Sequence, residues 1–221
     1  FEATGLVSDI EDLGTIMYDD ISGISSITND APEGFPLGET IVTWSVVDNY
    51  DNVSNGSQII TIVDTTNPEI IAPSNIITEA SNLLENIVEL NSARTSDNVE
   101  ILTITNDAPE VFPLGETIVT WTATDESGNQ STATQLINVV DTTSPLLTAP
   151  DNISIEINDT SGMMIEIGVP ILSDVIDENP IITNDAPEVF PLGETIVTWT
   201  ATDESGNQST ATQLINVVDT T

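Results

Sequence analysis

The chain has 221 residues, of which 37 are Asp or Glu and one is Lys or Arg, so its formal net charge is −36. This charge excludes nucleic acid and anionic membrane surfaces as partners, because almost no side chain could neutralise their phosphates. The chain has no Cys and no His, which excludes disulfides and the usual transition-metal sites, and it has no run of about 18 apolar residues that would insert into a membrane.

Short apolar stretches in the middle of the chain predict strands rather than helices. A polar linker at residues 64–68 precedes residues 70–78, where Pro73 interrupts the apolar pattern and predicts a first strand with a kink. Residues 86–92 alternate between apolar and polar side chains and predict a second strand. Residues 99–105 predict a third.

The clearest predicted strand is residues 116–124, which follows a loop rich in Pro and Gly. Val119, Trp121 and Ala123 alternate with threonines along it, which predicts one buried face and one wet face. The segment Asp-Glu-Ser-Gly-Asn then predicts a hairpin turn before a last strand at residues 131–140. Short strands punctuated by Pro and Gly favour a small antiparallel β-sandwich with a Trp in its core.

The same module occurs three times. Residues 104–143 recur without change at residues 182–221, and residues 27–66 align with both copies without gaps. A repeat of about 77 residues predicts an all-β chain of three tandem sandwich domains, named here the first, second and third repeats. Their predicted boundaries are residues 1–64, 65–141 and 142–221. Enzymes seldom carry three copies of one active site, so the repetition favours a structural role.

The first repeat aligns with the others only from Phe1 onwards, at the position of Thr78. We therefore expect it to lack its linker and N-terminal strand. Two interpretations stay open: the sequence is an excerpt or processed product of a longer array, or another subunit donates the strand and the protein self-associates into a polymer. Residues 219–221, where the next linker would begin, offer no spare strand to donate.

The repeated motifs resemble those of the hyalin repeat (HYR) family. The series F-P-x-G-x-T-x-V-x-W-x-A-x-D-x-x-G-N stands at residues 112–129 and 190–207, and the first copy reads VTWSVVDNYDN at residues 42–52. The resemblance implies tandem immunoglobulin-like sandwiches of extracellular adhesive and cell-surface proteins. Without cysteine, the chain is similar to prokaryotic-type members.

Two positions depart from the family pattern. Animal members place a disulfide between the positions of Ala72 and Ala133, and both residues are alanine here. Gln135 and Gln213 stand where the family prefers an apolar residue. The first departure removes the usual covalent link, and the second leaves the orientation of the last strand open.

Calcium is the predicted stabilising ligand, because small domains need support beyond their core and the available ligand atoms are oxygens. If the strands alternate in direction, the linker, one turn and the hairpin meet at one pole of the second repeat, beside the preceding repeat. The alternative is that the hairpin residues only form a turn. The predicted metal ligands are Asp64, Asp97, Asn98, Asp125 and Asn129 in the second repeat, Asp141, Asp174, Asp203 and Asn207 in the third, and Asp20, Asp48, Asp51 and Asn52 in the first.

Six N-x-S/T sequons suggest an exported glycoprotein, although a chain rich in Asn, Ser and Thr contains some by chance. They begin at Asn52, Asn55, Asn129, Asn152, Asn158 and Asn207.

These features predict a non-enzymatic extracellular protein: a calcium-stiffened stalk or filament subunit on a microbial cell surface. An alternative is an array of carbohydrate-binding accessory modules of a larger secreted protein. That function needs exposed aromatic side chains, and only Tyr18 and Tyr50 are not assigned to a core. A hydrolase is a third hypothesis, but no pair of catalytic carboxylates can be named, and His, Cys and Lys are missing.

Overall fold

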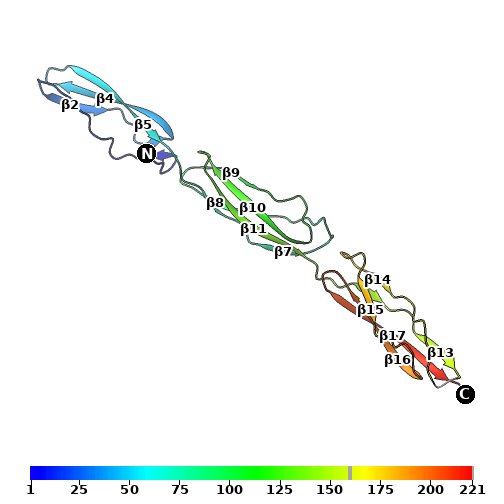
Figure 1. Ribbon diagram of the computed structural model, residues 1–221. Helices are drawn as coiled ribbons and strands as arrows, with labels where there is room; N and C mark the ends of the chain where they lie inside the picture. The colour runs from blue at the N-terminus through cyan, green and yellow to red at the C-terminus, as the bar shows by residue number, and fades with distance from the viewer. Residues whose placement is uncertain (159–160, 221) are drawn as a thin grey trace. The chain divides into compact units, whose positions relative to one another are not determined.

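The computed structural model describes residues 1–158 and 161–220. Its elements, β1 to β17, are all strands (Figure 1). Within these residues no helix has the length and apolarity that crossing a membrane requires. Contacts divide the chain into two compact units, one formed by Phe1–Ser74, Leu90–Ala108 and Ile118–Gln135, the other by Asn75–Glu89, Pro109–Thr117 and Leu136–Thr221.

The first repeat lies within the first unit and contains two antiparallel sheets, β1-β3 and β2-β4-β5. The hairpin β4–β5 is its longest pair, with Gly38 opposite Ile62 and Val47 opposite Val53. Its strands are β1 (Val7–Ser8), β2 (Ile24–Asn29), β3 (Phe35–Pro36), β4 (Gly38–Asp48) and β5 (Val53–Ile62).

The strands of the second repeat are shared between the two units. The first unit contains the antiparallel pair β6·β8 and the pairing of β9 with β10, and the second unit contains the parallel pairing of β7 with β11. The two sheets are β6-β8 and β7-β11-β10-β9. The strands are β6 (Glu69–Ile71), β7 (Ile76–Glu79), β8 (Arg94–Ser96), β9 (Ile101–Asn106), β10 (Gly115–Asp125) and β11 (Gln130–Val140).

The third repeat lies within the second unit and has the same strand order, in sheets β12-β14 and β13-β17-β16-β15. Two sheets in each repeat confirm the predicted all-β sandwich architecture, whereas the domain boundaries stay a prediction. The strands are β12 (Leu146–Thr148), β13 (Ile153–Ile157), β14 (Ile171–Ser173), β15 (Ile181–Asn184), β16 (Gly193–Thr202) and β17 (Gln208–Asp219).

The expected kinked first strand is instead two strands in different sheets. β6 pairs with β8, and β7 pairs with β11. Pro73 lies between them and has no backbone N–H for a sheet ladder, so pairing stops there and the chain changes sheets.

The expected second strand at residues 86–92 was also wrong. The structure has an isolated bridge between Asn86 and Phe112, and β8 begins only at Arg94. The Asn86 side chain accepts the backbone N–H of Ser81 at 2.8 Å and donates to the carbonyl of Asn82 at 2.7 Å. Such local bonds compete with strand pairing.

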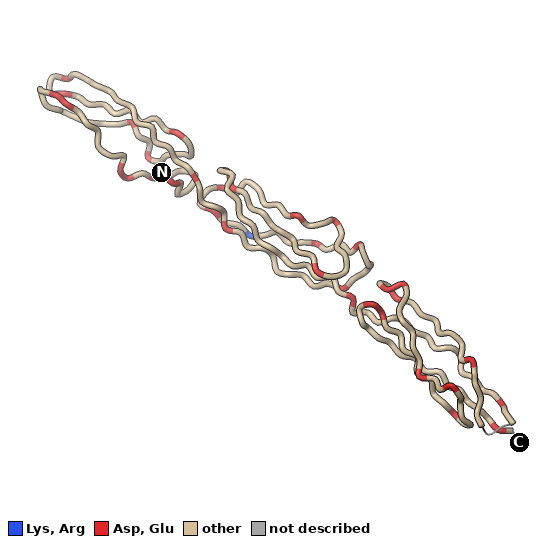
Figure 2. The backbone as a smooth tube through the Cα atoms, in the orientation of Figure 1, with Lys and Arg blue, Asp and Glu red and all other residues tan. Residues whose placement is uncertain are grey.

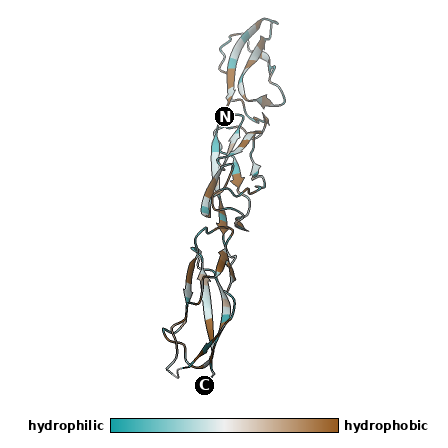
Figure 3. Ribbon diagram, turned by 90° about the vertical axis from the view of Figure 1, so that its right-hand side faces the viewer, coloured by the Kyte–Doolittle hydropathy of each residue, from teal (hydrophilic) through white to brown (hydrophobic). Residues whose placement is uncertain are grey.

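The Trp-bearing strands have the predicted two faces. Val197, Trp199 and Ala201 of β16 are buried, and the threonines between them are half-buried. Trp199 and Phe190 belong to one core cluster of the third repeat. Apolar and polar bands alternate along the long strands (Figure 3), as expected for strands with one face against a core.

Gln135 and Gln213 face the core, which resolves the orientation of the last strand. Gln213 is fully buried and accepts the indole N–H of Trp199 at 3.3 Å. Its amide nitrogen donates to the carbonyls of Asp151 and Ile167 at 2.7 and 3.0 Å. Gln135 does the same with Trp121 and Ser74. A glutamine at this apolar position therefore satisfies the buried indole and ties the hairpin to a loop.

We expect Gln213→Leu to lower the free energy of unfolding by about 2–3 kcal/mol, because it leaves the Trp199 N–H and two carbonyls unpaired. Urea titration followed by circular dichroism measures this. Gln208→Leu, at an exposed position of the same strand, is the matched control and should change stability by less than about 0.5 kcal/mol. Equal effects of the two substitutions would contradict the assigned role.

Candidate metal centre

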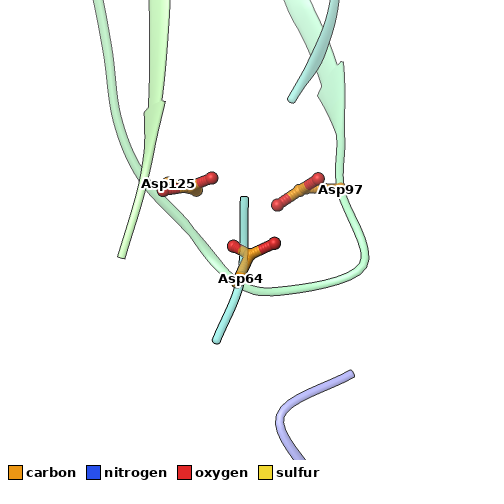
Figure 4. Close-up of side chains that lie close together, drawn as sticks. All are labelled: Asp64, Asp97 and Asp125. Atoms are coloured by element: carbon orange, nitrogen blue, oxygen red, sulfur yellow. The ribbon is translucent and has the colours of Figure 1, made fainter. Parts of the chain in front are cut away.

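Three carboxylates from distant parts of the chain meet in the first unit. Asp64 follows β5, Asp97 follows β8 and Asp125 ends β10, and ligand oxygens of the three lie within 4.8 Å of one another. Figure 4 shows the side chains facing a common space. Asp125 is fully buried, Asp64 is 8% exposed and Asp97 is half-buried. The structure thus brings together the linker, turn and hairpin carboxylates that the sequence analysis selected.

Asn129 holds two of these carboxylates in place. Its backbone N–H donates to Asp125 Oδ1 at 2.9 Å, and its side-chain Nδ2 donates to Asp125 Oδ2 at 2.9 Å. The same Nδ2 reaches Asp64 Oδ2 at 3.3 Å. Asn129 therefore acts on the cluster as a hydrogen-bond donor that connects the hairpin to the linker.

An equivalent cluster lies in the second unit. Asp141, Asp174 and Asp203 also place ligand oxygens within 4.8 Å of one another. As in the first cluster, the first and third aspartates are buried and the second is half-buried. Asn207 donates to Asp203 Oδ2 at 2.9 Å and to the carbonyl of Asp141 at 3.2 Å. The arrangement therefore recurs in the second and third repeats, whose hairpin residues are identical.

The second cluster contains carboxylate oxygens without a hydrogen-bond donor. Oδ1 of Asp174 accepts the backbone N–H groups of Ile176 and Asp177, at 2.8 and 2.9 Å. Oδ2 of Asp174 and Oδ2 of Asp141 are buried and have no partner. A buried charged oxygen without a donor is costly, and a cation would satisfy both atoms at once.

The sequence has a single basic side chain, Arg94, so basic residues cannot balance the negative charge of both clusters. Acidic residues are distributed along the whole tube (Figure 2). At 4.8 Å, two carboxylates repel each other by on the order of 3 kcal/mol at an effective dielectric constant of about 20. Calcium binds oxygens at about 2.3–2.6 Å, so ligands on opposite sides of one ion are about 5 Å apart. The donor set therefore fits this ion.

Not every predicted ligand joins a cluster. The Asn98 side chain donates to the carbonyl of Ala3 at 2.8 Å, and its Oδ1 is buried without a partner. In the first repeat, Asp48 is held by the backbone N–H and side chain of Asn52, each at 2.8 Å. Asp51 is exposed and has a φ of 63°.

Asp20 is the remaining predicted ligand of the first repeat, and it does not form a third cluster with Asp48 and Asp51 among the described residues. The hydroxyl of Ser22 lies within hydrogen-bonding distance of both Asp20 and Asp48, and its one proton can be donated to either carboxylate. The position that corresponds to Asp64 falls before Phe1 in the alignment of the repeats.

Three of the six sequon asparagines use the nitrogen that would carry a glycan. Nδ2 of Asn52, Asn129 and Asn207 donates to an aspartate in each case. Asn55 and Asn152 are exposed. The sequon at Asn158 includes residues 159–160, which lie outside the described residues. Glycosylation stays a prediction, and it competes with the cluster geometry at Asn129 and Asn207.

The sequence analysis did not predict a second type of contact at the linkers, in which a glutamate accepts hydrogen bonds from two threonines. Glu79 accepts the backbone N–H of Thr142 at 2.8 Å and the hydroxyls of Thr142 and Thr143 at 2.7 and 2.9 Å. Glu2 makes the same contacts with Thr65 and Thr66. The backbone hydrogen bond from Thr142, followed by those from the hydroxyls, lowers the pKa of Glu79. The recurrence of Glu-Ala and Thr-Thr at fixed positions was the available signal.

Comparison with known proteins identifies relatives of the repeats. A family model described as HYR domain matches residues 63–139 and 140–217. Hyalin of Lytechinus variegatus is 36% identical over 206 residues, which cover 84% of this chain and 38% of hyalin. The Serine-rich adhesin for platelets of Staphylococcus aureus (strain MSSA476) is 27% identical over 209 residues, 88% of this chain and 8% of the adhesin. The chain thus spans well under half the length of either relative. Protocadherin Gamma B2 extracellular cadherin domains 3-6 align with 81% of this chain and 57% of theirs, at 17% identity and a TM-score of 0.33.

Asn129→Ala should move the acid-induced loss of stability to higher pH. Burial raises the pKa of Asp125, but hydrogen bonds, first from Asn129, outweigh it and lower the pKa below 3.8. A depressed pKa contributes stability above the ordinary value, and this contribution is lost as pH falls through the lower folded value. Asn129→Ala removes the side-chain donor and keeps the backbone N–H, so the loss begins at a higher pH than in the unmodified protein, and stability at neutral pH falls by about 1–3 kcal/mol.

Melting temperatures between about pH 2 and pH 6 measure this effect. Asn55→Ala, at an exposed asparagine of β5, is the control and should follow the unmodified protein. An Asn129→Ala curve that also follows it would show that Asn129 does not stabilise the ionised Asp125.

Proposed function

The chain belongs to the HYR domain family, and we propose that it is part of an extracellular, non-enzymatic adhesive protein whose repeats are stiffened by calcium. The observation that carries this proposal is the recurrence of a cluster of three aspartates at equivalent positions of the second and third repeats. Membership of the family and the likeness to an adhesin support the adhesive role. The repeats act in it as spacers that hold a binding surface or a neighbouring subunit at a distance.

Calcium links segments that are far apart along the chain. Asp64 belongs to the linker after β5, and Asp97 and Asp125 belong to the sandwich that follows. A cation bound by all three would restrain the linker relative to that sandwich, because it ties together segments that otherwise repel. The contacts of Glu2 with Thr65 and Thr66 restrain the same linker without a metal.

Buried oxygens without donors support a cation in the third repeat. Oδ2 of Asp141 and Oδ2 of Asp174 have no hydrogen-bond partner, and Asp141 is 8% exposed. With a cation the two atoms would contribute to binding, and without one their repulsion lowers stability. The cluster therefore favours a protein whose stiffness depends on the calcium concentration of its surroundings.

In this proposal the repeats mediate adhesion by associating with other copies of the chain or with a partner. The formal net charge of −36 opposes close approach of two copies, so divalent cations would also reduce repulsion between molecules. We place the protein on a cell surface, and the lack of cysteine favours a microbial one. As a stalk or filament subunit, the chain needs no catalytic group.

The effect of Asp174→Asn on the melting temperature should depend on whether calcium is present. The substitution replaces the unpartnered Oδ2 with an amide that can donate to neighbouring carboxylates, while Oδ1 keeps its two N–H donors. We expect a higher melting temperature than the unmodified protein in chelator. We expect calcium to bind with a dissociation constant on the order of 0.1–1 mM. At calcium concentrations above this value, the rise in melting temperature that calcium causes should be smaller in Asp174→Asn than in the unmodified protein, by roughly 5 °C.

Differential scanning calorimetry and isothermal titration calorimetry measure these two effects. Glu188→Gln, an exposed residue of the same repeat, makes the same change in charge and should alter neither. Identical calcium binding by Asp174→Asn and the unmodified chain would refute the assignment of the site.

Beads coated with the chain should aggregate in millimolar calcium and disperse in chelator. Asp174→Asn beads should aggregate more slowly, because their repeats are less restrained, whereas Glu188→Gln beads should behave as the unmodified ones. Light scattering records the rate. If coated beads fail to associate with one another or with cells while calcium still binds, the adhesive role is excluded and the metal site is retained.

A further inference from the structure

Glu79 lies beside the point where the linker to the third repeat begins. It ends β7, which pairs in parallel with β11 so that Glu79 stands opposite Val140, the residue before Asp141. The backbone N–H of Ala80 donates to the Val140 carbonyl at 2.7 Å and extends this pairing. The register therefore brings a glutamate of the second repeat to the first carboxylate of the second cluster, and all of these residues belong to the second unit.

Thr143 connects this glutamate to Asp141. Its hydroxyl donates to Glu79 Oε1 at 2.9 Å, and its backbone N–H donates to Asp141 Oδ1 at 3.1 Å. Thr142 also donates to Glu79, from its backbone N–H at 2.8 Å and from its hydroxyl at 2.7 Å, but neither bond involves Asp141. Thr143 is therefore the residue through which the position of the glutamate reaches the cluster.

The two oxygens of Asp141 have different surroundings. Oδ1 accepts the Thr143 N–H, whereas Oδ2 is buried without a partner, in a residue that is 8% exposed. Groups that hydrogen-bond to a metal ligand orient it, and their loss weakens metal binding although they never touch the ion. By occupying Oδ1, Thr143 fixes the carboxylate and leaves Oδ2 available to a cation.

The same connection occurs at the first cluster. Thr66 donates from its hydroxyl to Glu2 Oε1 at 3.0 Å and from its backbone N–H to Asp64 Oδ1 at 3.2 Å. Among the described residues, neither Glu2 nor Glu79 belongs to the groups whose ligand oxygens lie within 4.8 Å of one another. Each glutamate therefore reaches its cluster through a threonine and not as a further ligand.

We propose that Glu79 is a positioning residue of the metal centre: it holds Thr143, and Thr143 sets the Asp141 carboxylate in the orientation that binds calcium. The inference rests on the proposed calcium site and adds that the affinity of this site depends on a strand of the preceding repeat. A displacement of β7 releases Thr143 and Asp141 together. Calcium binding and the pairing of β7 with β11 therefore stabilise each other, as reciprocal linkage requires.

Substitutions at Thr143 test the connection through its hydroxyl. Asp97→Asn takes one carboxylate from the first cluster, so calorimetric titration of the full chain in this background reports calcium binding at the second cluster. Thr143→Val loses the hydroxyl but keeps the backbone N–H, and it should raise the calcium dissociation constant about threefold to tenfold. Thr143→Ser restores the hydroxyl and should bind calcium as the background protein does.

Thr142→Val is the matched control, because it removes a hydroxyl that donates to Glu79 without a bond to Asp141. It should change the calcium dissociation constant by less than about twofold. An unchanged dissociation constant in Thr143→Val overturns the proposal, and so does an equal effect of Thr142→Val and Thr143→Val.

Substitutions at Glu79 separate hydrogen bonding from charge. Oε1 accepts both the Thr142 N–H and the Thr143 hydroxyl, and glutamine keeps such an oxygen while it removes the charge. Glu79→Ala should raise the dissociation constant about threefold to tenfold. Glu79→Gln should stay within about twofold, because salt screens exposed charges beyond about 8 Å. If Glu79→Gln binds calcium as weakly as Glu79→Ala does, the glutamate acts through its charge and the positioning role is wrong.

Melting temperatures with and without calcium distinguish positioning from a general loss of stability. Thr143→Val should reduce the rise in melting temperature that calcium causes, whereas Thr143→Ser should not. If Thr143→Val melts lower by the same amount in chelator and in calcium, the hydroxyl is only structural and the proposal is overturned.

The background protein separates failure of the inference from failure of the metal site. Calcium binding that Asp174→Asn abolishes and Thr143→Val leaves unchanged retains the site and refutes the role of Glu79 alone. If calcium does not bind the background protein or the unmodified chain, the metal site and its positioning residue both fail.

Discussion

Mutual repulsion of three carboxylates within 4.8 Å sets the main constraint on each complete repeat. The strands place the carboxylates there because each lies at the end of a strand or in a turn beside it. Asn129 and Asn207 offset part of the repulsion by donating to the nearest aspartates. The sequence has one basic side chain, so basic residues do not balance the charge that remains.

The core of each sandwich is small and is fixed by a few polar contacts as well as by apolar packing. The buried indole of Trp199 needs an acceptor, and Gln213 supplies it while also satisfying two loop carbonyls. Glu79 accepts hydrogen bonds from Thr142 and Thr143 and so restrains the linker that begins at Asp141. The glutamine fixes the middle of the hairpin, and the Glu79 contacts lie directly beside Asp141.

Much of this arrangement could be predicted from single elements of the sequence. The alternation around Trp121 predicted strand β10 and its buried face, and the Asp-Glu-Ser-Gly-Asn segment predicted the hairpin. The strand at residues 86–92 could not be judged correctly, because the local hydrogen bonds of Asn86 compete with pairing and leave no mark in the hydrophobic pattern. The change of sheet at Pro73 could not be predicted either, because a proline indicates that strand pairing is interrupted but not which strand the chain pairs with afterwards.

By itself the sequence determined the repeat, the all-β class and the restriction to oxygen ligands, since these follow from composition and from periods of two residues and of a whole module. Only the tertiary structure decided that Asp64, Asp97 and Asp125 share one space while Asp20, Asp48 and Asp51 do not. The three aspartates come from distant segments, and no local pattern in the sequence shows which segments the fold brings together. It also decided that Gln135 and Gln213 face inward, because only the packed core shows which buried donor needs an acceptor.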